Sequence, residues 1–117
     1  MKTLLIETIE NVGYEKLVFL HGSMNPDEGF PHKFVTIKTM SSPDIAHYDN
    51  VSVGTAWEFQ VINYSDDPRI VADDSKKIRD ALRSAGFIPQ GKGYDIPSDE
   101  PTHSGWLCDY LILEMED

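Results

Sequence analysis

Three carboxylates and one histidine lie within nine consecutive positions near the C-terminal end of the chain: Asp95, Asp99, Glu100 and His103. Carboxylate oxygens are ligands that hard divalent cations prefer, so this group could hold a metal ion. The segment lacks the glycine-defined spacing of a calcium loop, and the same residues are typical of a solvated loop whose histidine bonds locally. We therefore expect a structural or interface role, with no metal and no cofactor. A metal-binding module or metal-dependent enzyme built on these residues is the alternative.

Other patterns that could support catalysis are incomplete. Gly91-Lys92-Gly93 shares glycines and a lysine with phosphate-binding loops, but the first glycine and the terminal Ser or Thr of that motif are missing. Ser104 follows His103 directly, and adjacent residues of an extended chain point to opposite faces, so the two do not form a nucleophile and its base. The single cysteine, Cys108, lies in an apolar run and is interpreted as a small buried side chain. No catalytic residue is predicted, and we expect a protein that is not an enzyme.

Length and composition indicate one globular domain over residues 1–117, with 40% hydrophobic and 26% charged residues. No apolar run approaches the roughly 18 residues that a membrane-spanning helix needs. Glu7 and Glu10 interrupt the apolar N-terminal stretch before a secretory signal could form. We expect no membrane association and a location in the cytoplasm of the producing cell.

The charge balance is strongly acidic, because 20 acidic and 10 basic residues give a formal net charge of −10. A protein that binds nucleic acid through its phosphates needs a basic face. Basic side chains gather only in residues 76–83, where an acid interrupts them and further acids precede them. This pattern favours a mixed-charge, solvated helix face, and no stable nucleic-acid binding is expected.

The first half of the chain predicts one helix followed by strands. Leu5, Ile9 and Val12 form one helical stripe over residues 2–11, and Gly13 follows as a C-cap. Residues 34–40 are rich in β-branched side chains and predict a strand, followed by a shorter extended piece at 46–50. Residues 51–64 alternate apolar and polar side chains, which predicts a long strand that bends near Gly54.

The second half predicts a helix, a long loop and a final strand. Ser65-Asp66-Asp67-Pro68 is a strong helix start, and the apolar stripe continues to residue 85, before Gly86. Residues 90–104 are expected to form a loop, and 105–115 a strand with apolar side chains on both faces. The order of elements predicts an α+β two-layer sandwich, a mainly antiparallel sheet of about four strands with two helices on one face.

Two loops and the exposed strand faces are the predicted contact surfaces. The loop at residues 22–31 is rich in turn-forming residues, and the loop at 90–104 is longer than usual. Aromatic residues on the strands are explained most simply as core, with packing against another subunit as the alternative. The predicted interface residues are Asn25, Phe30, Trp57, Tyr94, Ile96 and Trp106.

Four motifs follow one another in the second half: Tyr64-Ser65-Asp66-Asp67-Pro68, Leu82-Arg83-Ser84-Ala85-Gly86-Phe87-Ile88, Gly91-Lys92-Gly93-Tyr94-Asp95, and Ser98-Asp99-Glu100-Pro101-Thr102-His103-Ser104-Gly105-Trp106. In this order the chain resembles small tail-completion and tail-terminator (head–tail joining, neck) proteins of long-tailed bacteriophages and of Gram-positive prophages. The first half is similar in layout, so the resemblance spans nearly the whole chain.

The resemblance implies a structural role. Tail terminators close the head-proximal end of the tail tube as rings, commonly hexamers, with an α+β fold whose sheet neighbouring subunits extend or cover, and they have no catalytic residues. The implied partners are further copies of the chain, tail-tube proteins and neck proteins. DNA would pass through the ring, and the excess of acidic residues would suit a channel lining that repels DNA. The implied location is the host bacterial cytoplasm during assembly and then the tail or neck of the virion. A monomeric cytoplasmic regulator that binds a host protein is a further alternative.

Overall fold

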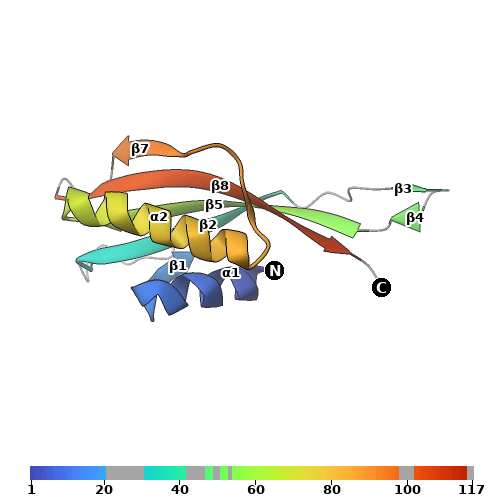
Figure 1. The fold of residues 1–117 in the computed structure, drawn as a ribbon, viewed down its shortest axis with the longest axis horizontal. Coiled ribbons are helices and arrows are strands. Elements are labelled where there is room, and N and C mark those ends of the chain that lie inside the picture. The colour runs from blue at the N-terminus through green and yellow to red at the C-terminus, as the bar shows by residue number, and fades with distance from the viewer. Residues whose placement is uncertain (21–30, 42–46, 49–50, 53, 98–101, 116–117) are drawn as a thin grey trace.

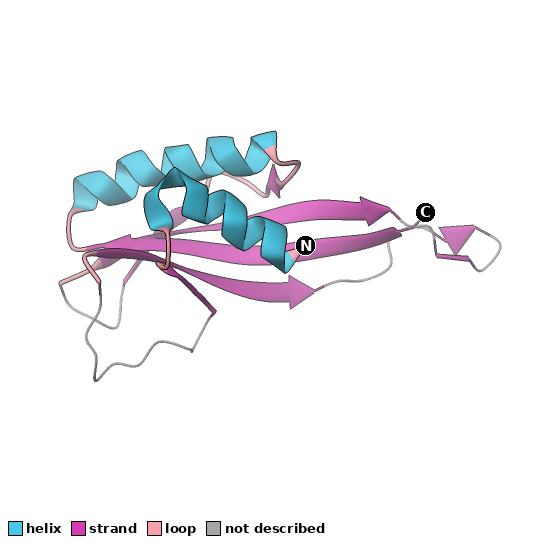
Figure 2. Ribbon diagram, turned by 90° about the horizontal axis from the view of Figure 1, so that it is seen from below, coloured by secondary structure: helices cyan, strands magenta, loops and turns pink. Residues whose placement is uncertain are grey.

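Two layers, one of helices and one of strands, make up the fold. The structure is a computed structural model that describes residues 1–20, 31–41, 47–48, 51–52, 54–97 and 102–115. A six-stranded mixed sheet forms one layer, and both helices lie on the same side of it (Figure 1, Figure 2). The predicted α+β class is therefore confirmed. None of the helices in these residues is long and apolar enough to cross a membrane.

The N-terminal helix matches the predicted stripe. Helix α1 (Lys2–Ile9) runs directly into a π-helical turn, η1 (Glu10–Tyr14). Leu5 and Ile9 are fully buried. Gly13 lies within the turn at φ +108°, a conformation that glycine adopts without steric strain, and the chain leaves the helix at this point.

The second helix, α2 (Pro68–Ser84), also forms where the sequence predicts it. Asp67 is the N-cap, and its carboxylate accepts a hydrogen bond of 2.9 Å from the Arg69 amide. Val71, Ile78 and Leu82 are buried, as the apolar stripe requires. Beyond the C-cap, Gly86 takes φ +102° and ends the helix.

Three long antiparallel strands form the middle of the sheet. The sheet order is β1-β2-β5-β8-β6, and β7 also pairs with β8. Its strands are β1 (Val18–Leu20), β2 (Lys33–Ser41), β5 (Gly54–Ser65), β6 (Ile88–Pro89), β7 (Tyr94–Pro97) and β8 (Ser104–Met115). A separate two-stranded sheet consists of β3 (His47–Tyr48) and β4 (Val51–Ser52). Strand β8 is thus central, in agreement with its apolar residues on both faces.

The predicted mainly antiparallel sheet of about four strands is not exact, because the sheet has six strands and one of its pairs is parallel. Strand β1 pairs parallel to β2, and the predicted loop at 90–104 contains β7, which pairs with residues 104–107 of β8. Strands β1 and β6 have only three and two residues, too few to display a period of two. Pairing with a distant strand, rather than local sequence, makes these segments extended.

Strand register assigns each side chain to one face of the sheet. Residues Val35, Phe59, Val61, Cys108 and Tyr110 point toward the helices and form the core with the apolar stripes of α1 and α2. Their neighbours in sequence point to the opposite face, because successive side chains alternate along a strand.

One charged group is buried at the junction of the helices and the sheet. Asp74 of α2 is only 7% exposed and accepts a hydrogen bond of 2.6 Å from the Tyr14 hydroxyl. The Lys33 ammonium lies 3.5 Å from the same carboxylate and 4.5 Å from the centre of the Tyr14 ring. Buried charges need such partners, so this cluster ties η1, α2 and β2 together.

Candidate functional site

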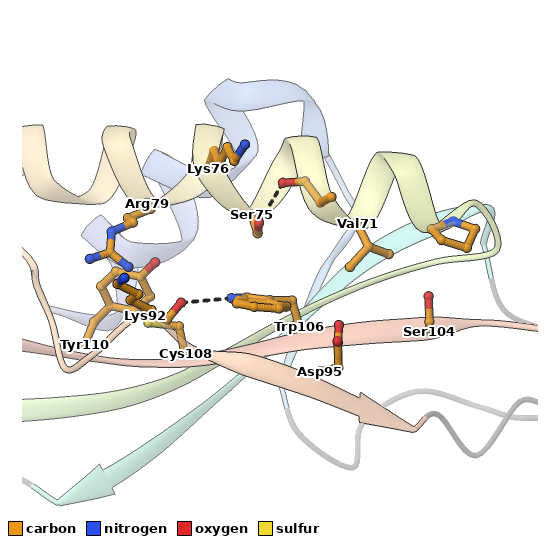
Figure 3. A pocket seen from close by; sticks show the side chains of 12 residues that line it. Val71, Ser75, Lys76, Arg79, Lys92, Asp95, Ser104, Trp106, Cys108 and Tyr110 are labelled. Atoms are coloured by element: carbon orange, nitrogen blue, oxygen red, sulfur yellow. Dashed lines mark hydrogen bonds between the residues drawn. The ribbon is translucent and has the colours of Figure 1, made fainter.

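A groove of about 570 Å³ lies between α2 and the helix-facing side of β8 (Figure 3). We call it the α2–β8 groove. One stripe of α2 forms one wall, because residues three and four apart share a helix face. The lining residues are Pro68, Val71, Ala72, Ser75, Lys76 and Arg79 from α2, Lys92 and Asp95 before and within β7, and Ser104, Trp106, Cys108 and Tyr110 from β8. Grooves of this volume with apolar walls and few polar groups are typical binding sites.

The charged side chains of the groove are mostly basic. Lys76, Arg79 and Lys92 line it against a single carboxylate, that of Asp95. The Arg79 guanidinium donates a hydrogen bond of 3.1 Å to the Gly91 carbonyl, which holds it against the segment before β7. A net positive groove on a chain of net charge −10 is suited to an acidic occupant.

The floor of the groove is rigidly packed around Trp106. Its indole N–H donates a hydrogen bond of 3.2 Å to the Lys92 carbonyl. Gly93 passes directly over the indole, at φ +87°, and a Cβ there would also lie 2.6 Å from the Leu107 carbonyl oxygen. Only glycine fits this position, so Gly93 brings the segment before β7 against the floor.

The cysteine in the groove has the properties of a packing residue. Cys108 is 5% exposed, and burial raises the pKa of its thiol. Because the thiolate is the reactive form, a raised pKa makes this thiol a poor nucleophile at neutral pH.

No described helix or strand covers the opposite face of the sheet, here called the open face. It is formed by the side chains that alternate with the helix-facing ones, including Glu58, Gln60, Asp109, Leu111 and Leu113. Cross-strand register also places Ile88 and Tyr94 there, opposite Leu111 and Leu107. Three of these apolar side chains are about half exposed, namely Ile88 (50%), Tyr94 (58%) and Leu113 (47%). Apolar side chains gathered on one face are typical of a protein contact surface.

Two carboxylates lie close together at the centre of the open face. Glu58 pairs with Leu111 and Asp109 pairs with Gln60, so the two acids are diagonal neighbours. Partial burial, and then the charge of Glu58, raise the pKa of the Asp109 carboxyl. Oδ1 of Asp109 is buried without a hydrogen-bond partner in the described part of the chain. Lys38 of β2 lies opposite Gln60 on the same face, so a cation stands beside the two acids.

Of the four residues predicted as a weak metal group, the structure describes Asp95 and His103. Asp99 and Glu100 lie outside the described residues. His103 uses both ring nitrogens locally: Nε2 lies 2.8 Å from the Pro31 carbonyl oxygen and Nδ1 lies 3.0 Å from the Thr102 hydroxyl. Asp95 lines the α2–β8 groove. No group of three possible ligands occurs among the residues that the structure describes.

The predicted interface residues lie on both sides of the sheet. Trp106 forms the groove floor, and Trp57 packs against the core on the same side. Tyr94 and Ile96 alternate onto the open face through their pairing with Leu107 and Gly105. The other two, Asn25 and Phe30, lie outside the described residues.

The groove itself was missed by sequence reasoning. For this segment the sequence predicts only an apolar stripe and a mixed-charge, solvated face within residues 76–83. The one available signal was that Val71, Lys76 and Arg79 share the helical stripe of Pro68, Ala72 and Ser75. Which element faces that stripe depends on long-range pairing of β7 with β8.

Comparison with known proteins adds no family assignment. No protein-family model matches the chain, and no relative was found among curated proteins.

Proposed function

We propose that this chain is a structural protein that acts by packing against further copies of itself into a ring, as a tail-terminator, tail-completion or head–tail joining component of a long-tailed phage. The proposal concerns assembly rather than catalysis. The observation that carries it is a sheet with both helices on one side and half-exposed apolar side chains, Ile88, Tyr94 and Leu113, on the other.

Burial of these side chains would stabilise an oligomer. Each large apolar side chain that leaves water contributes roughly 1.5–3 kcal/mol. Apart from Asp109, strand β8 carries mainly apolar residues on both faces, a pattern expected when both faces are covered. The resemblance of the sequence to tail-terminator proteins supports the same function, since their rings use the sheet for contacts between subunits.

Local contacts favour assembly over the metal-binding alternative. His103, the one nitrogen ligand of that predicted group, already bonds to Pro31 and Thr102 through its two ring nitrogens. These contacts join the segments that precede β2 and β8, which is a structural role.

The mass of the protein in solution tests the proposal. We would measure it by light scattering behind size-exclusion chromatography over a range of concentrations, with negative-stain microscopy of the largest species. A discrete closed oligomer with ring-shaped particles supports the proposal. A strict monomer at every concentration would contradict it and would favour the monomeric regulator.

A matched pair of variants ties the oligomer to the open face. Leu113→Lys places a charge on that face, and it should raise the midpoint concentration of assembly by about tenfold or more, because a contact of 1.4 kcal/mol corresponds to about a tenfold change. Leu4→Lys changes an exposed leucine of α1, 37% exposed, on the helix side. It should leave the midpoint within about twofold, since isolated surface positions contribute little.

A further inference from the structure

The α2–β8 groove gathers cations that the protein itself does not neutralise. Lys76, Arg79 and Lys92 line it, and within the described part of the chain none of the three forms an ion pair. Asp95 is the one carboxylate of the lining, and the acidic side chains of α2 lie outside it. The groove is therefore suited to an anionic ligand.

Arg79 is held in place before any ligand arrives. Its half-buried side chain donates a hydrogen bond of 3.1 Å to the Gly91 carbonyl, and Gly91 is its one hydrogen-bond acceptor among the described residues. A guanidinium has five N–H donors in a planar fork, and this fork matches the two oxygens of a carboxylate. A side chain that is already positioned loses little conformational entropy when it binds.

The floor and wall of the groove offer an apolar surface beside these cations. Figure 3 shows the Trp106 ring edge-on below Ser75, so one face of the indole is turned toward α2. The indole N–H is already bonded to the Lys92 carbonyl, so the ring presents its apolar face to a ligand. Val71 lines the groove beside it. Aromatic rings stack favourably on such a face.

The groove also has a direction. Arg79 and Lys92 lie near Tyr110 at one end, while Asp95 lies beyond Trp106 toward the other end (Figure 3). A ligand carboxylate is attracted to the first end and repelled from the second. A ligand of this kind would therefore place its acid group at the Tyr110 end and its apolar body over Trp106.

We propose that the α2–β8 groove binds a small aromatic carboxylate, with the acid group on Arg79 and the neighbouring lysines and the ring on the indole of Trp106. The groove volume of about 570 Å³ suits a small organic ligand. This site goes beyond the proposed function and does not depend on it, because the groove and the open face lie on opposite sides of β8.

Calorimetric titration of the full chain with 2-naphthoate tests the ligand class. Naphthoate should bind with a Kd of about 1 mM or below. The matched neutral compound 2-naphthamide has the same rings and nearly the same shape, and it should bind about tenfold or more weakly because it lacks the charge that the guanidinium pairs with. Added salt should weaken the binding of naphthoate and leave that of naphthamide nearly unchanged.

Fluorine NMR of the chain labelled with 5-fluorotryptophan locates the ligand. The chain has two tryptophans, so two signals are expected, and a Trp57→Phe variant assigns them. Naphthoate should shift the Trp106 signal and leave the Trp57 signal in place, since Trp57 does not line the groove.

A matched pair of double variants tests the cations. Lys76→Gln with Lys92→Gln removes two groove charges whose side chains have no described bonds, and it should raise the Kd for naphthoate about fivefold or more. Lys2→Gln with Lys16→Gln removes the same charge from exposed positions outside the groove, and it should leave the Kd within about twofold. Arg79 stays unchanged in both because it also holds the Gly91 carbonyl.

Several results would overturn the ligand site while the proposed function stands. These are the absence of binding heat at millimolar naphthoate, equal affinity for naphthoate and naphthamide, an unmoved Trp106 signal, and equal losses in the two double variants. An affinity that falls as the protein assembles would show that a neighbouring copy fills the groove instead. A short acidic peptide of alternating glutamate and leucine that binds more tightly than naphthoate would assign the groove to a protein partner.

Discussion

Replacing Gly93 by alanine should destabilise the protein much more than the same change at Gly91, two residues earlier. Both glycines have positive φ, +93° at Gly91 and +87° at Gly93, so both alanines meet the same backbone strain. That strain costs about 1–2 kcal/mol. A Cβ at Gly91 meets nothing within 4 Å, and this variant should lose only the strain term.

At Gly93 two further losses are added. The new Cβ would overlap the Trp106 indole and lie 2.6 Å from the Leu107 carbonyl oxygen, which is strand backbone and has little room to move. Forcing a methyl group into packed surroundings costs about 1–3 kcal/mol. Moving the indole also breaks its 3.2 Å hydrogen bond to Lys92, worth about 1 kcal/mol. The expected loss is therefore about 3 kcal/mol or more.

Urea unfolding measures the difference, followed by far-ultraviolet circular dichroism and by tryptophan emission. A Trp57→Phe background leaves Trp106 as the only indole, and it also removes a buried Trp57 N–H that has no partner in the described residues. The emission of Trp106 should shift to the red in Gly93→Ala and stay unchanged in Gly91→Ala. Equal losses of stability in the two variants would refute the packing of Gly93 on Trp106.

Three further predictions concern the hydroxyl and carboxyl groups of the fold. Tyr14→Phe removes the donor to buried Asp74 and should lower the free energy of unfolding in urea by about 1.5–3 kcal/mol, against about 0.5 or less for the exposed control Tyr94→Phe. Burial, and for Tyr14 also the bond to Asp74, raise the pKa of the Tyr14 and Tyr110 hydroxyls, so the folded state favours their neutral forms. The resulting stability should be present below the ordinary tyrosine pKa of 10.0 and be lost as the pH rises above it. In Tyr14→Phe the free energy of unfolding should fall less steeply with rising pH. A urea midpoint that does not change at alkaline pH would contradict this prediction. The hydrogen bond from the Arg69 amide lowers the pKa of the Asp67 carboxyl, so the stability from this cap should be present above the ordinary carboxyl pKa and lost as the pH falls; Asp67→Ala should lower the melting temperature at neutral pH and have little effect in strong acid.

Local chemistry in the sequence determined both helices and most of the long strands, although the strand predicted at 51–64 begins only at Gly54 and residues 51–52 pair with β3 instead. Asp67 and Pro68 start α2 because a carboxylate caps free amides and proline fits the first turn, and both effects act within a few residues. The alternation around Phe59 likewise predicted a strand with one packed face, and the apolar residues on both faces of β8 predicted a strand with neighbours on both edges.

Tertiary structure alone decided the short strands and the groove. Strands β1 and β7 are extended because β2 and β8 supply their hydrogen-bond partners, which no local pattern encodes. The sequence predicts α2 as a helix of mixed charge. Long-range pairing of the chain decides which face of α2 packs against which other element. It directs Asp74 toward Tyr14 and Lys33, and it brings Lys76 and Arg79 to the groove over β8. Contacts between segments far apart in the chain carry this information, because local propensity is set by near neighbours and burial is set by the whole fold.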